Sequence, residues 1–135
     1  MDALAIINKY YSEENELKHI LLTHSRSVAD KALQIAVKHP ELHLDTGFLE
    51  EAALLHDIGI FMTDASGIQC FGTHPYICHG YLGSELLMKR VSPPCIGCER
   101  HTGAGMSLQS IIEQDLPIPH RDMVPVSMED RLFVL

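Results

Sequence analysis

Apolar residues recur at helical spacing from the first residues of the chain. Leu4, Ile7 and Tyr11 lie three or four positions apart and predict an amphipathic helix over residues 2–11. The same three-to-four spacing of apolar residues returns in most later segments. The pattern therefore predicts an all-α fold, built from helices that each bury one face.

Capping residues predict two helices between residues 12 and 38. Ser12, followed by two glutamates, predicts the N-cap of a second helix that ends at about residue 22. A third helix is predicted from about residue 23 to residue 38, with His24 in its first turn. It should end at His39-Pro40, because the residue before a proline avoids helical angles.

A fourth helix is predicted to begin at Asp45 or Thr46, either of which suits a helix cap. Gly59 is placed to terminate it, since glycine is common just after the last turn. His56 and Asp57 would then lie at its C-terminal end.

The chain from residue 61 to 73 has few periodic apolar residues and several glycines, which predicts a long loop. Such loops in small domains are often functional. The next helix is expected to open at Pro75 or Tyr76 and to run to about residue 90.

Shorter helices are predicted in the last third of the chain. Ser92-Pro93 resembles an N-cap followed by a first-turn proline, starting a helix that reaches His101. Ser107 is predicted to cap a brief helix through Glu113. Ser127 begins a last helix that is still apolar where the sequence stops, so we expect the C-terminal helix to be incomplete. Its exposed apolar surface would favour a homo-oligomer.

Length and composition agree with one compact domain over residues 1–135. The chain is 46% hydrophobic and 21% charged, enough apolar material for a core. A net charge of -8 argues against a general nucleic-acid binder. No apolar run approaches the roughly 18 residues of a membrane span, and no signal pattern opens the chain, so a cytoplasmic protein without membrane contact is expected.

One four-residue motif carries the most specific signal in the sequence. His56-Asp57-Ile58-Gly59, preceded by two alanines and two leucines, resembles the HDIG signature of HD-domain metal-dependent phosphohydrolases. His24, about thirty residues upstream, resembles the first ligand of that family. His79 and His101 resemble the two further histidines of its two-metal members. The resemblance implies the HD-domain helical fold.

The resemblance also implies a metal site and a reaction. His24, His56 and Asp57 would hold one metal ion, and Asp57 would bridge to a second ion held by His79 and His101. The ligand types do not distinguish Fe, Mn, Zn, Mg, Co and Ni, so one or two divalent ions are expected. A metal-activated water would hydrolyse a small phosphorylated, nucleotide-like substrate.

Two arginines are candidates for binding the phosphate of that substrate. Arg26 follows His24 closely and Arg100 precedes His101, and guanidinium groups suit phosphate oxygens. Family members also supply a last aspartate ligand from a C-terminal helix. Either Asp122 or Asp130 substitutes for it here, or the ligand lies beyond residue 135. We favour the second alternative, because neither aspartate has the apolar-flanked, mid-helix context expected of that ligand.

Three other interpretations remain open. Related two-iron sites are similar to those of oxygenases, so a di-iron oxygenase is one. A module that binds nucleotides without catalysis is another. A structural zinc site is the third, formed by Cys95, Cys98 and His101 with Cys70 or Cys78 as the fourth ligand.

Overall fold

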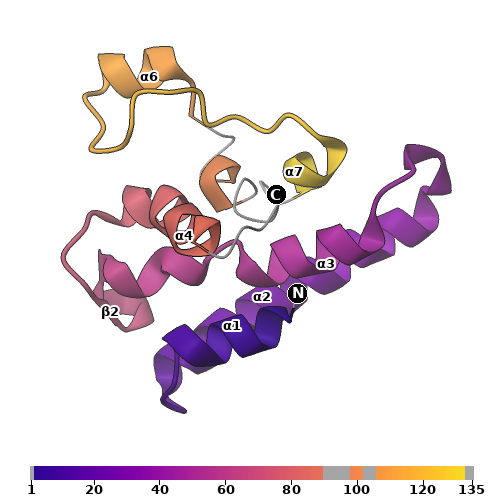
Figure 1. Cartoon of the computed structure of the whole chain (residues 1–135), viewed down its shortest axis with the longest axis horizontal. Coiled ribbons are helices and arrows are strands. Elements are labelled where there is room, and N and C mark those ends of the chain that lie inside the picture. Colours follow the sequence, from indigo (N-terminus) through magenta and orange to yellow (C-terminus); the bar gives the residue numbers. More distant parts are fainter. Residues whose placement is uncertain (1, 90–97, 102–105, 133–135) are drawn as a thin grey trace.

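The computed structural model describes residues 2–89, 98–101 and 106–132, and it is built almost entirely from helices. The all-α prediction is confirmed. Figure 1 shows the first three α-helices gathered on one side of the molecule and the later helices on the other. None of the described helices has the length and apolarity needed to cross a bilayer.

Helix α1, Ala3–Tyr10, confirms the first predicted helix. Its N-terminus is capped by Asp2, whose carboxylate accepts a hydrogen bond from the Ala5 amide. Ile6 and Ile7 are buried on its inner face. Tyr11, just beyond the helix, is buried as well, and its ring meets Phe61 edge-on.

Helix α2, Glu16–Lys38, replaces the two helices predicted between residues 12 and 38. Asn15, not Ser12, is its N-cap and accepts a hydrogen bond from the Lys18 amide. No glycine or proline interrupts the stretch, and a buried stripe of small and apolar side chains continues across the expected break. His24 therefore lies well inside a long helix and not in a first turn. The end at His39 is confirmed, with a short 3-10 turn, η1 (Pro40–Leu42), beyond it.

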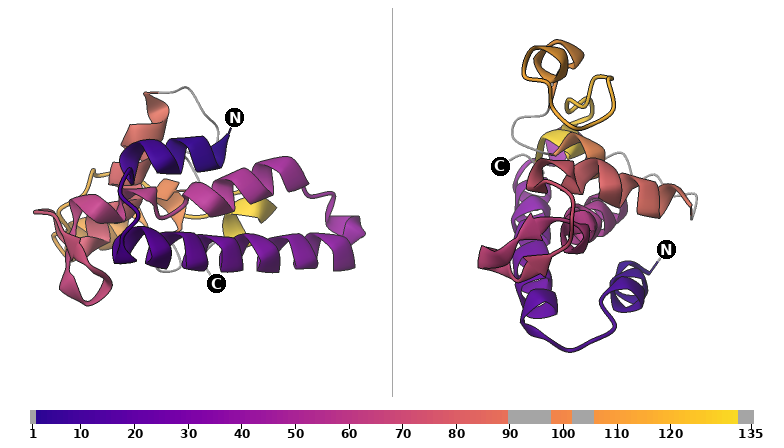
Figure 2. Two further views of the ribbon diagram at one scale, coloured as in Figure 1. Left: turned by 90° about the horizontal axis from the view of Figure 1, so that it is seen from below. Right: turned by 90° about the vertical axis from the view of Figure 1, so that its left-hand side faces the viewer.

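Helix α3, Thr46–Leu55, lies along α2, as both views of Figure 2 show. Asp45 is its N-cap, confirming one of the two predicted start residues. Ala52 and Ala53 are fully buried, and such small side chains allow two helices to approach closely. The main core lies between α1, α2 and α3.

The prediction that Gly59 terminates this helix is wrong. Helix α3 ends at Leu55, and Gly59 lies inside the next element, the 3-10 helix η2 (Ile58–Met62). A Cβ atom added to Gly59 would lie 2.3 Å from the carbonyl oxygen of His79 and 2.6 Å from the amide nitrogen of Gly83. The glycine is needed for backbone contact with the following helix, not for a helix end.

The segment predicted as a long loop is compact. It contains a two-residue antiparallel hairpin, β1 (Asp64–Ala65) and β2 (Cys70–Phe71), around the 3-10 turn η3 (Ser66–Ile68). A further 3-10 turn, η4 (Tyr76–Cys78), leads into helix α4 (His79–Met88). The predicted start at Pro75 or Tyr76 is where this 3-10 turn begins, and the α-helix itself starts at His79.

The last third of the chain holds short helices. Residues 98–100 are helical, while the predicted start at Ser92-Pro93 lies outside the described residues. Helix α6 (Leu108–Glu113) with its Ser107 cap is confirmed. Helix α7 (Met128–Leu132) begins after Ser127 as predicted. A second, smaller core joins α4 to this region through Leu82, Ile111 and Met123.

Candidate metal centre

The backbone around Asp57 is held by contacts from two directions. The buried hydroxyl of Tyr11 donates a hydrogen bond of 2.7 Å to the carbonyl oxygen of Ile58. On the other side, Gly59 packs against Gly83 of α4, and a Cβ on Gly83 would lie 3.1 Å from the Gly59 amide nitrogen. Asp57 is thus fixed between the end of α3 and helix α4.

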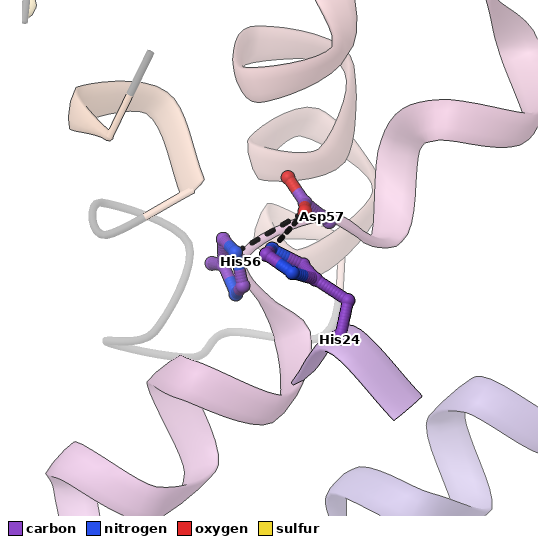
Figure 3. Close-up of side chains that lie close together, drawn as sticks. All are labelled: His24, His56 and Asp57. Atoms are coloured by element: carbon purple, nitrogen blue, oxygen red, sulfur yellow. Dashed lines mark ion pairs between the residues drawn. The ribbon is translucent and has the colours of Figure 1, made fainter. Parts of the chain in front are cut away.

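The first pair of imidazoles faces one oxygen of the Asp57 carboxylate. The Nε2 atoms of His24 and His56 each lie 3.2 Å from Oδ2 of Asp57. Figure 3 shows the two rings pointing at the same carboxylate, although His24 comes from α2 and His56 from the end of α3. Their ligand atoms lie close enough together to hold one metal ion.

The second pair faces the other oxygen. The Nε2 atoms of His79 and His101 lie 3.3 Å and 2.9 Å from Oδ1 of Asp57. These two Nε2 atoms are also only 2.9 Å from one another. His79 opens α4 and His101 follows the helical residues 98–100, so Asp57 is shared by two groups of three ligands.

Backbone carbonyls orient three of the four imidazoles in the same way. The Nδ1 atoms of His56, His79 and His101 each lie 2.6 Å from the carbonyl oxygen of the residue three positions earlier. A carbonyl only accepts, so each Nδ1 carries the hydrogen. In the neutral ring the lone pair is then on Nε2, the atom that faces Asp57.

This arrangement fits a bound metal. Lone pairs on two Nε2 atoms 2.9 Å apart repel one another, and they also repel the carboxylate oxygen between them. A cation placed among these atoms turns the repulsion into coordination, and imidazole and carboxylate suit divalent transition ions. Backbone hydrogen bonds on the far side of metal-binding histidines are the usual means of orienting them.

The proton affinities of the cluster follow from its burial and its hydrogen bonds. Burial alone raises the pKa of Asp57, but in the metal-free protein a histidine ring that also carries a proton on Nε2 donates a hydrogen bond to the carboxylate, and these bonds from the four histidines hold the pKa of Asp57 below its usual range. The hydrogen bond to Asp57 raises the pKa of His24. Burial lowers the pKa of His101, which keeps that imidazole in the neutral form that binds metal.

All five residues predicted as metal ligands, His24, His56, Asp57, His79 and His101, meet in this cluster. The two predicted arginines pair with carboxylates that lie outside the two ligand groups. Arg26 lies 3.1 Å from Glu50, and Arg100 lies 3.2 Å from Asp130.

The two aspartates named as substitutes for a last ligand lie outside the ligand groups that the described residues form. Asp122 accepts a hydrogen bond from the Leu108 amide. Asp130 is buried, accepts from Arg100, and also accepts from the amides of Val126 and Ser127. Both carboxylates act in local structure.

The zinc site formed by cysteines has no support in the described part of the chain. Cys98 donates to the carbonyl oxygen of Leu55 and Cys78 to that of Pro117, and no cysteine joins a ligand group there. Cys95 lies outside the described residues. His101 is directed at Asp57 instead.

Two tyrosines near the centre were missed at the level of sequence. Tyr11 holds Ile58 in place, and Tyr76 stacks on the ring of His79 with 4.4 Å between centroids. Tyr76 lies three residues before the candidate ligand His79, just as Ala53 and Cys98 lie three residues before His56 and His101. This spacing is the one feature of the sequence that could have pointed to Tyr76. Nothing in the sequence pointed to Tyr11, which is 47 positions from its partner.

Comparison with known proteins agrees with this geometry. The family model described as "HD domain" matches residues 21–123, a span that contains all five ligands. No solved structure matches the chain.

Two curated relatives are similar in sequence. An uncharacterized protein of Methanocaldococcus jannaschii is 31% identical over 134 residues, covering 96% of this chain and 68% of that protein. A tRNA (cytidine(56)-2'-O)-methyltransferase of Picrophilus torridus is 30% identical over 115 residues, covering 84% of this chain but only 29% of the methyltransferase. The family match, which spans more than half of the chain, shows that the chain belongs to the HD-domain superfamily of metal-dependent phosphohydrolases.

Proposed function

We propose that this protein hydrolyses a phosphoester of a small, nucleotide-like molecule with the help of one or two divalent metal ions. One observation carries the proposal: four imidazoles from separate parts of the chain converge on both oxygens of a single buried carboxylate. A structural metal site would need only four ligands and would be closed to substrate. Here the His24 side chain is 54% exposed, so one side of the cluster is open.

The residues would divide the work as follows. His24 and His56 would hold one ion, His79 and His101 the other, and Asp57 would belong to both ligand sets. When bound, the ions supply the Lewis acidity that lowers the pKa of a water molecule and neutralises charge on the phosphate. The carbonyl-anchored imidazoles of His56, His79 and His101 keep their geometry without reorganising.

Arg26 and Arg100 are proposed as phosphate contacts. Each is a near neighbour in sequence of a candidate ligand, and each is partly exposed. Their present partners, Glu50 and Asp130, would hold the guanidinium groups in place before substrate arrives. In this proposal each guanidinium group would contact the phosphate through charge-assisted hydrogen bonds.

A small-molecule substrate suits the charge of the protein better than a nucleic acid does. The net charge of -8 opposes binding to a polyanion, whereas the centre itself becomes locally positive once divalent ions are bound. A single phosphate can therefore be attracted locally while a long phosphate backbone is repelled.

The test begins with protein purified without added metal and analysed for its elements. Hydrolysis of p-nitrophenyl phosphate and bis(p-nitrophenyl) phosphate is then assayed with Mn²⁺, Co²⁺, Ni²⁺, Zn²⁺, Mg²⁺ and Fe²⁺. We expect turnover with at least one ion, and its loss in the double variant His56→Ala with Asp57→Ala. His39→Gln is the matched control, because His39 is exposed, pairs with Glu41 and belongs to neither ligand group.

Two results would replace the proposal with its alternatives. Oxygen uptake coupled to product formation by the iron-loaded protein, without phosphoester hydrolysis, would identify an oxygenase. Nucleotide binding without turnover in excess Mn²⁺ would identify a sensor.

A further inference from the structure

A cavity of about 250 Å³ opens directly beside the metal centre. The candidate ligands His24 and Asp57 form part of its wall. The rest of the wall is mainly apolar and comes from separate elements: Ile20 of α2, Ile60 of η2 and Ile68 of η3. The cavity is therefore built by tertiary packing next to the groups that would bind phosphate.

The chemistry of the wall indicates what kind of group fits. Among the residues that the structure describes, no lysine or arginine lines the cavity, and the single carboxylate of that lining is the shared ligand Asp57. An anionic group placed against the isoleucines would lose its hydration without gaining a cationic partner. An uncharged apolar group, by contrast, would gain from leaving water.

The size of the cavity also limits its occupant. About 250 Å³ is smaller than the roughly 300–1,000 Å³ of pockets that enclose a drug-sized ligand. One ring or a short aliphatic group fits this space better than a dinucleotide does.

Tyr76 joins the cavity to the ligand cluster. Its ring lies against that of His79 with an interplanar angle of 30°, and its carbonyl oxygen accepts the Nδ1 hydrogen bond of His79. The residue lines the cavity and stays 43% exposed. Since His79 covers one face of the ring, the other face remains for an incoming planar group.

We infer that this cavity binds the uncharged, apolar or aromatic part of the substrate, and that Tyr76 is the residue that determines this specificity. The inference rests on the proposed function, because it places the phosphate of the same molecule on the metal centre. Phosphoesters with a ring next to the phosphate would be preferred over those with a small or charged group.

The test compares two non-hydrolysable probes, phenylphosphonate and methylphosphonate, which carry the same charged group and differ in the ring. Their dissociation constants for the metal-loaded protein are measured by titration calorimetry. We expect phenylphosphonate to bind about 10-fold more tightly, as burial of one ring allows. Tyr76→Ala should bring the ratio of the two dissociation constants close to one, whereas Tyr76→Phe should keep the ratio.

Phe71→Ala is the matched control, because Phe71 is an aromatic residue of the same region that is 73% exposed and does not line the cavity. It should leave both constants unchanged. A purely structural role of Tyr76 would weaken both phosphonates equally and lower the metal content of Tyr76→Ala, and this result would overturn the inference.

Failure of the inference and failure of the proposed function give different results. Equal binding of the two phosphonates, or binding of neither, would overturn the inference even if p-nitrophenyl phosphate is hydrolysed. Absence of all phosphoester hydrolysis would overturn the proposed function, while a ring preference lost in Tyr76→Ala would still assign the cavity as an apolar binding site.

Discussion

The two halves of the ligand cluster differ in how firmly the fold holds them. On the side of Asp57 Oδ1, His79 and His101 are both buried and both tied to backbone carbonyls. On the side of Oδ2, His56 is equally buried, but His24 reaches in from the middle of α2 with a side chain that is 54% exposed. The half at Oδ1 is therefore preorganised, whereas the half at Oδ2 is open to solvent and to the cavity at His24.

Removing the shared carboxylate should break both halves at once. Asp57→Asn keeps the size of the side chain but removes the charge that faces all four imidazoles. Loss of a group that only supports a ligand typically weakens metal binding about 10–100-fold. Asp57 is itself a candidate ligand of both groups, so we expect the metal affinity to fall roughly a thousandfold. Elemental analysis after dialysis measures it. Retention of full metal occupancy would show that Asp57 is not a ligand.

Forcing η2 away from α4 should separate the halves from one another. In Gly59→Ala the new Cβ meets the backbone at His79 and Gly83, neither of which can move alone. We expect a loss of at least about 3 kcal/mol in the free energy of unfolding, the upper range for overpacking. Urea denaturation measures it. Gly67→Ala is the control, since a Cβ there meets nothing within 4 Å; equal effects of the two substitutions would contradict the close-packing role of Gly59.

Removing one histidine from each half should sharpen the difference between them. His101→Gln leaves a gap in a buried, fixed site, whereas His24→Gln changes an exposed position that a water molecule can fill. We expect the metal affinity to fall at least about 10-fold more in His101→Gln. Competition with a chelator measures both constants. A larger loss in His24→Gln would reverse the comparison.

Loosening the support of Asp57 should have a smaller effect. Tyr11→Phe removes the donor to the Ile58 carbonyl without changing the packing of the ring. A buried acceptor left without its partner costs about 1–3 kcal/mol. Thermal unfolding of the metal-free protein measures it. An unchanged melting temperature in Tyr11→Phe would contradict a stabilising role of this hydrogen bond.

The smallest expected effect is a difference in proton affinity between the halves of the metal-free protein. The bond to Asp57 raises the pKa of His24, whereas burial lowers that of His101. His24 should therefore titrate above the usual histidine value of about 6.5, and His101 below it. NMR of the imidazole nitrogens measures both.

The two shifts act on stability in opposite directions. The contribution of His24 is fully present below about pH 6.5 and is lost as the pH rises through its higher folded value. For His101 the unfolded chain takes up the proton first, so stability falls as the pH drops below about 6.5. The same pKa for both histidines would contradict the difference in their surroundings.

The sequence alone identified the elements whose signals are local. The N-caps Asp45 and Ser107 and the helix end at His39 were all predicted correctly, because a cap acts on amides within three residues. The sequence pattern did not identify the start of α2 correctly, because both Ser12 and Asn15 can cap a helix. The packing of a continuous buried stripe of side chains along α2 decides in favour of Asn15.

The five ligands were predicted from motif resemblance, and their chemistry follows from residue type alone. What only the tertiary structure decided is which oxygen of Asp57 each imidazole faces, which side of the cluster is open, and that Tyr11 and Tyr76 support it. Gly59 belongs with these, since its role depends on a helix more than twenty residues away. The physical reason is range: caps and periodicity act between near neighbours, whereas a metal centre depends on how distant segments pack.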